Sequence, residues 1–175
     1  GPGSSKFRRA RLRRGLAEYN LRVIVSGSGS INPEAMVFSW ERRRPAGEFP
    51  KDGGPNLPAG RQRSQSRAPL IILTTSRASK SKLRKLRALA DEVKVCGKTE
   101  INFRQAFRWL REQWGVKRLL CEGGGELNDA LIRAGLLDEL HLTISPKIFG
   151  GRTAPTIADG SGFPRLAAAA KFQLK

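Results

Sequence analysis

The segment from Leu119 to Ile132 constrains the fold of this chain more than any other. It has a short apolar stretch, three glycines at 123–125, and then apolar residues at helical spacing. This pattern predicts a buried strand that enters a helix through a loop without side chains. Such a loop lets the backbone approach a ligand closely, and the first N–H groups of the helix then face an anion such as a pyrophosphate. A tight strand-to-helix turn without a ligand is the alternative interpretation.

The glycine loop, defined as Gly123 to Gly125, does not match the dinucleotide fingerprint Gly-x-Gly-x-x-Gly. No acidic residue follows on a second strand at the expected distance of about 20 residues. A nucleotide site at this loop would therefore belong to a different fold. The residues predicted to contact a nucleotide cofactor at this loop are Gly123, Gly124, Gly125, Glu126 and Leu127.

Two further predicted strands end in small polar residues, and in open α/β sheets ligands bind outside the carboxyl ends of the strands. We therefore expect both strand ends and the glycine loop to converge on one crevice and to contact the cofactor. The strand-end residues are Ser26, Gly27, Ser28, Thr74 and Thr75. The alternative for the two threonines is that they finish a strand and cap the segment that follows.

Strands and helices alternate along the chain, which favours the α/β class with a mainly parallel sheet covered on both faces. The apolar patterns predict strands at 21–25, 69–75, 93–96, 116–121 and 140–146, and helices at 80–93, 102–114 and from the glycine loop to 134. Residues 41–68 are rich in proline and glycine and lack apolar periodicity. Since most loops are shorter than about 12–15 residues, we interpret this segment as a flexible insertion.

The chain has 175 residues, enough for one domain with a core of its own, predicted over 5–175. The first four residues resemble the remnant of a cleaved expression tag.

No apolar run reaches the roughly 18 residues of a membrane span, so we expect no membrane association. The two cysteines, Cys96 and Cys121, lack the spacing of a zinc site or a disulfide framework, which favours a reducing, cytoplasmic setting and no bound metal.

The formal net charge is +18, and the excess lies in the first half of the chain. Residues 1–90 hold 20 of the 33 Lys and Arg residues but only 5 of the 15 Asp and Glu residues. Basic runs can indicate nucleic-acid binding. These runs are not accompanied by a nucleic-acid-binding motif or by a basic surface with interspersed aromatic residues. We therefore favour a solvated basic face or a positive electrostatic field that attracts phosphorylated ligands.

Several short motifs combine over about 30 residues into a specific pattern. They are Glu122-Gly123-Gly124, the run from Ala134 to Leu140 (Ala-Gly-Leu-Leu-Asp-Glu-Leu), Pro146 and Gly150-Gly151. In this combination the chain resembles the pyrimidine reductases of riboflavin biosynthesis, whose fold is like that of dihydrofolate reductase. The resemblance covers roughly residues 20–39 and 69–164. It implies a three-layer dihydrofolate-reductase-like fold with a mainly parallel sheet.

The resemblance also implies an activity, which is the NADPH-dependent reduction of a ribosylamino-pyrimidine 5′-phosphate to its ribitylamino form. In that family the glutamate before the glycine loop binds the substrate, which assigns this role to Glu122. Capping of local N–H groups is the alternative for Glu122. The resemblance further implies a homodimer and a cis peptide bond between Gly123 and Gly124.

The sequence departs from the family pattern at both ends. Nothing in residues 1–20 matches the first strand and helix of the family, and its last strand hairpin would follow residues 172–174. We therefore expect a fold that lacks these parts, with unpaired backbone and apolar surface exposed. Two other functions stay open: a dihydrofolate-reductase-like oxidoreductase of another substrate, and a basic binding module on the same scaffold.

Overall fold

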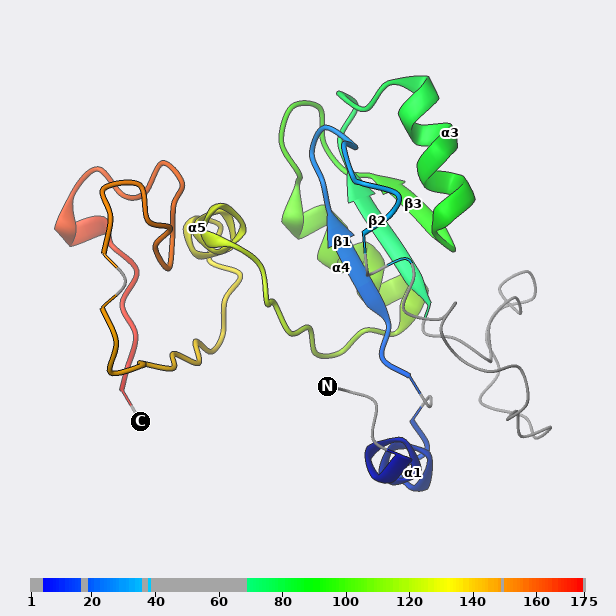
Figure 1. Ribbon diagram of the computed structural model, residues 1–175, viewed down its shortest axis with the longest axis horizontal. Coiled ribbons are helices and arrows are strands. Elements are labelled where there is room, and N and C mark those ends of the chain that lie inside the picture. Colours follow the sequence, from blue (N-terminus) through cyan, green and yellow to red (C-terminus); the bar gives the residue numbers. More distant parts are fainter. Residues whose placement is uncertain (1–4, 17–18, 36–37, 39–68, 149, 175) are drawn as a thin grey trace. The chain divides into compact units, whose positions relative to one another are not determined.

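The computed structural model describes residues 5–16, 19–35, 38, 69–148 and 150–174 (Figure 1). The chain divides into two compact units, Gly1–Ile101 and Asn102–Lys175. The segments interpreted above as a tag remnant, 1–4, and as an insertion, 41–68, lie outside the described residues. The expectation of a single domain over 5–175 stays a prediction.

The first unit is built on a parallel sheet of three strands in the order β1-β2-β3. Its strands are β1 (Arg22–Val25), β2 (Leu70–Thr74) and β3 (Glu92–Val95). The register aligns Val23 with Ile71, and Ile72 with Val93. Every residue of the central strand β2 is buried, as its continuous apolar run leads one to expect of a parallel strand. The predicted α/β class and parallel sheet are confirmed.

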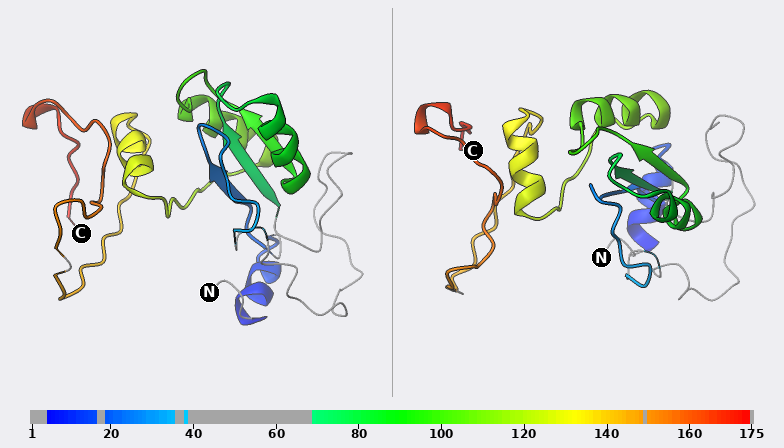
Figure 2. Two further views of the ribbon diagram at one scale, coloured as in Figure 1. Left: turned by 45° about the horizontal axis from the view of Figure 1, so that its top comes forward. Right: turned by 90° about the horizontal axis from the view of Figure 1, so that it is seen from above.

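Helix α3 (Lys80–Leu89) connects β2 to β3 and lies along one face of the sheet (Figure 2). Its N-cap is Ser79, whose hydroxyl oxygen accepts the backbone N–H of Lys82 at 3.3 Å. The helix ends earlier than the predicted residue 93. The reason is pairing with the sheet, because the Asp91 backbone N–H donates to the Leu70 carbonyl at 2.9 Å and β3 begins at the next residue.

The described part of the first unit also contains α1 (Ser5–Arg13), a helix that the sequence reasoning did not predict. The Arg8 guanidinium donates a hydrogen bond to the Tyr19 hydroxyl at 3.0 Å and lies 5.8 Å from the centre of its ring. The helix was missed because its sequence is dominated by basic residues and offers almost no apolar periodicity.

The second unit contains α4 (Phe103–Trp114), α5 (Gly125–Arg133) and a short 3₁₀ helix, η2 (Leu166–Ala168). Both α-helices were predicted from apolar spacing. The N-cap of α4 is Asn102, whose side chain accepts the Gln105 N–H at 3.0 Å, and the helix ends at Gly115 with a left-handed φ of 63°. The Arg104 guanidinium donates to the Ala134 carbonyl and links the two helices.

The strands predicted at 116–121 and 140–146 are wrong, since both segments are irregular. An extended segment becomes a strand only where a neighbour completes its backbone hydrogen bonds. The described residues form a single sheet of three strands, and neither segment belongs to it. Their apolar side chains are left exposed, with Leu120 at 78% and Ile144 at 82% of full exposure.

Candidate functional site

The ends of β1 and β2 lie side by side, as predicted for Ser26 to Ser28 and for Thr74 and Thr75. The Thr75 hydroxyl donates to the Gly27 carbonyl at 2.6 Å, and the Thr74 hydroxyl lies 3.5 Å from the same oxygen. Both threonines are fully buried. Thr75 Oγ1 also accepts the Arg77 N–H at 3.2 Å, so Thr75 caps the segment that follows it. The convergence of these two strand ends is confirmed, whereas their contact with a cofactor stays a prediction.

A glycine that the sequence reasoning did not assign to the site fixes the path of the loop after β1. Gly29 has a left-handed φ of +65°, and a Cβ at this position would lie 2.8 Å from the Ala78 Cβ. The Ala78 methyl group is buried and attached directly to the backbone, so it cannot rotate away. Only glycine satisfies both the backbone conformation and the close approach.

We expect Gly29→Ala to lower the free energy of unfolding of the first unit by about 2–5 kcal/mol. A left-handed conformation costs a non-glycine residue about 1–2 kcal/mol, and overpacking adds about 1–3 kcal/mol. Gly15→Ala is the matched control, because Gly15 has a φ of +67° in the same unit and a Cβ there would meet nothing within 4 Å. Equal losses for both variants in denaturant unfolding would show that the contact with Ala78 contributes nothing.

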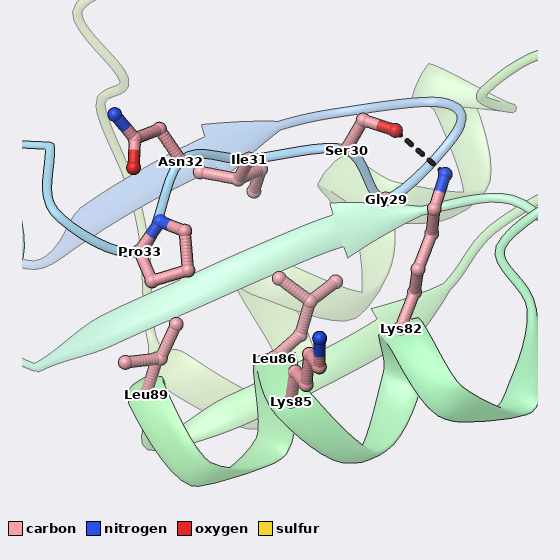
Figure 3. Close-up of a pocket in the computed structure, with 9 residues that line it drawn as sticks. All are labelled: Gly29, Ser30, Ile31, Asn32, Pro33, Lys82, Lys85, Leu86 and Leu89. Carbon is pink, nitrogen blue, oxygen red and sulfur yellow. Dashed lines mark hydrogen bonds between the residues drawn. The ribbon is translucent and has the colours of Figure 1, made fainter.

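A groove lies between the loop after β1 and helix α3 (Figure 3). We call it the lysine groove, and it has a volume of about 450 Å³. Its lining residues are Gly29, Ser30, Ile31, Asn32, Pro33, Lys82, Lys85, Leu86 and Leu89. The sequence reasoning assigned the lysines to the solvated face of a helix. Their position beside a loop more than 50 residues earlier in the chain has no local sequence signal.

The glycine loop precedes α5 in the second unit. The N-cap residue Gly124 has no side chain with which to cap the helix, and a Cβ on it would meet nothing within 4 Å. The first N–H groups of a helix have no partner inside the helix. Gly124 and Glu122 are both exposed. The loop therefore presents bare backbone and a carboxylate to solvent, which fits an anionic ligand beside a polar one.

Two aspartates that the sequence reasoning missed hold the segment 156–162 against α5. The Asp159 carboxylate lies against Gly125 and accepts the Thr156 hydroxyl at 2.6 Å. The buried Asp129 accepts the Arg133 guanidinium at 2.7 Å and the Gly162 backbone N–H at 3.1 Å. These contacts close one side of the first turn of α5 and leave Gly124 as the open side of the loop.

Other expectations about the site have mixed outcomes. The predicted cis bond at Gly123–Gly124 is wrong, because no peptide bond among the described residues is cis. Within the same residues, no cluster of three or more His, Cys, Asp or Glu side chains could hold a metal ion.

Burial raises the pKa of the Cys96 thiol, an effect that the nearby Lys94 charge partly offsets. Since the thiol is favoured over the thiolate, Cys96 is a poor nucleophile.

The two parts of the predicted crevice belong to different units. The strand ends lie in Gly1–Ile101, and the glycine loop lies in Asn102–Lys175. Each part has the local structure that the sequence predicts for it, apart from the missing strand before the glycine loop and the missing cis bond at Gly123–Gly124. Their meeting at one site stays a prediction.

The family model described as the RibD C-terminal domain matches residues 5–175. Similar curated proteins include two named 2,5-diamino-6-ribosylamino-4(3H)-pyrimidinone 5′-phosphate reductase. The protein from Aquifex aeolicus is 39% identical over 99 residues, which are 57% of this chain and 44% of that protein. The protein from Methanothermobacter thermautotrophicus is 36% identical over 108 residues, which are 62% of this chain and 49% of that protein. The chain thus spans about half the length of these relatives.

Among solved structures, a pyrimidine reductase-like protein from Corynebacterium diphtheriae has a similar fold. It aligns with a TM-score of 0.64 and 20% sequence identity, covering 89% of this chain and 56% of that one. At this identity the likeness supports the fold alone. Together with the parallel sheet, it confirms the α/β architecture that the resemblance implied.

Proposed function

Because this chain belongs to the RibD C-terminal domain family, we propose that it is an NADPH-dependent reductase of a ribosylamino-pyrimidine 5′-phosphate in riboflavin biosynthesis. The reaction transfers a hydride to the ribosyl C1′ and gives the ribitylamino product. The names of the Aquifex and Methanothermobacter relatives support this substrate class. In this proposal the chain acts as a cytoplasmic homodimer. No helix among the described residues has the length and apolar character needed to cross a membrane.

The observation that carries the proposal is the uncapped, side-chain-free start of α5. A dinucleotide pyrophosphate needs backbone N–H donors and a surface that it can approach closely. Gly124 offers both, because its side of the loop is open and the helix dipole places partial positive charge there. The residues present at this loop therefore fit the group.

Each part of the proposed site has a distinct role. The backbone from Gly123 to Leu127 binds the pyrophosphate, and Ser26 to Ser28 with Thr74 and Thr75 form the second part of the cofactor site. Glu122 accepts hydrogen bonds from polar groups of the pyrimidine substrate and orients it. NADPH supplies the hydride when bound, and the protein contributes placement and electrostatics.

Parallel titrations of the full chain with NADPH and with duplex DNA separate an enzyme from a basic binding module. We expect saturable binding of NADPH. Duplex DNA should bind weakly and lose affinity steeply as salt is raised, because only counterion release drives its binding to the basic first half of the chain. Sub-micromolar, salt-resistant binding to one DNA sequence, with no binding of NADPH, would overturn the proposed function.

A further inference from the structure

The lysine groove has a fixed cationic end beside the loop that follows β1 (Figure 3). The Lys82 ammonium donates to the Ser30 hydroxyl at 2.6 Å and to the Ser28 carbonyl at 3.4 Å. The Ser28 hydroxyl in turn accepts the Ser30 N–H at 3.3 Å. An ammonium group has three N–H donors, and these contacts use two of them. Among the described residues, Lys82 is therefore held in place with a donor left for a ligand.

The charge of the groove is not neutralised by its own lining. Its nine lining residues include two lysines and no acidic residue. Lys82 and Lys85 are three residues apart on α3, a spacing that places side chains on the same face of a helix. A ligand in the groove therefore meets two positive charges. This arrangement favours a dianion over a neutral or singly charged group.

The rest of the groove is apolar and suits the body of a nucleotide better than an inorganic ion. Ile31 and Pro33 from the loop, and Leu86 and Leu89 from α3, line it beside the lysines. Asn32 adds an amide whose oxygen accepts the Glu34 N–H at 2.9 Å and whose NH2 group can donate to a ligand. The groove thus combines an anion-binding end, an apolar surface and a polar group, which is the usual composition of a small-molecule site.

We propose that the lysine groove binds a phosphate monoester carried on a ribose, with Lys82 as the residue that determines specificity for the phosphate. This inference deepens the proposed function and rests on it, because that reaction brings two such groups to the enzyme. One is the 2′-phosphate of NADPH and the other is the 5′-phosphate of the pyrimidine substrate. The apolar lining beside Lys82 favours the cofactor, whose adenine can lie on it. Binding of the 2′-phosphate here would make the enzyme prefer NADPH to NADH.

The test is calorimetric titration of the full chain with two probes, adenosine 2′-monophosphate and ribose 5-phosphate. Each is compared between wild type, Lys82→Gln and the control Lys80→Gln. Lys80 is an exposed lysine on the same helix that does not line the groove, so the two variants lose the same charge. We expect Lys82→Gln to weaken binding of the adenosine probe by roughly tenfold or more, since it removes a charge-assisted hydrogen bond. Lys80→Gln should change it by less than about twofold, as expected of a screened surface charge.

Each outcome is decisive for the groove. If the ribose probe alone depends on Lys82, the site stands and its phosphate comes from the substrate. If neither probe binds, or if both variants weaken binding equally, the proposal is wrong and the lysines belong to a diffuse basic surface. Neither probe contains nicotinamide or undergoes hydride transfer. If binding of a probe depends on Lys82 but the chain has no reductase activity, the proposed function is refuted and the groove proposal stands. If the chain is an active reductase but binding of neither probe depends on Lys82, only the groove proposal is refuted.

Discussion

Replacing Glu122 with glutamine is expected to lower kcat/KM by about 10- to 150-fold, because a charge-assisted hydrogen bond contributes about 1.5–3 kcal/mol. The affinity for NADPH should be nearly unchanged, since the cofactor is held by the backbone of the glycine loop. Glutamine keeps the shape and hydrogen-bonding reach of the side chain and removes only its charge. Steady-state kinetics with the ribosylamino-pyrimidine 5′-phosphate, alongside NADPH titration, measure the two effects separately.

The capping role for Glu122 predicts the opposite pattern for this variant. The melting temperature would fall and the kinetics would stay near normal, because a cap stabilises the local backbone without touching the substrate. Thermal unfolding of Glu122→Gln therefore accompanies the kinetics. If neither stability nor kinetics respond to the change, Glu122 is neither a ligand nor a cap and the site assignment fails.

Gly124→Val is expected to abolish NADPH binding with only a modest loss of stability. The backbone of Gly124 is extended, with φ −79° and ψ 176°, a conformation that valine adopts readily. A Cβ at this position meets nothing within 4 Å, so the protein itself tolerates the side chain. The added methyl groups project into the space where the pyrophosphate must approach the backbone.

Fluorescence titration with NADPH and thermal unfolding measure the two effects of Gly124→Val. Gly124→Ala provides a graded control, because a single methyl group fills less of the open side and should weaken binding less. Gly125 is unsuitable for such a test, since a side chain there would collide with the Asp159 carboxylate. NADPH affinity that survives the valine substitution would show that the glycine loop is only a turn.

Sequence reasoning worked where a local pattern determines the structure. The apolar run of β2 indicated a strand buried on both faces, and Asn102 and Gly115 marked the two ends of α4. The start of α5 at the glycine loop was also predicted, because three glycines before an apolar helical pattern leave few other conformations.

Sequence reasoning failed where structure depends on residues far away in the chain. The alternation of apolar and polar residues over 140–146 indicates a segment suited to a strand. A strand also requires a neighbouring strand to complete its hydrogen bonds, and the described residues provide none for this segment. Lys82 contacts Ser30 and Asp129 contacts Gly162 across long stretches of sequence. The residues next to Lys82 and Asp129 in the sequence do not distinguish these two positions from ordinary surface positions on an amphipathic helix.

The most direct test of the proposed reductase is the oxidation of bound NADPH by the ribosylamino-pyrimidine 5′-phosphate, followed by the loss of reduced-nicotinamide absorbance. Dihydrofolate serves as the competing substrate, because a dihydrofolate-reductase-like fold admits that alternative. The proposed function predicts one NADPH oxidised for each ribitylamino product formed, and no oxidation with dihydrofolate. A chain that binds NADPH and the pyrimidine but oxidises no cofactor, or one that oxidises it only with dihydrofolate, would contradict this function.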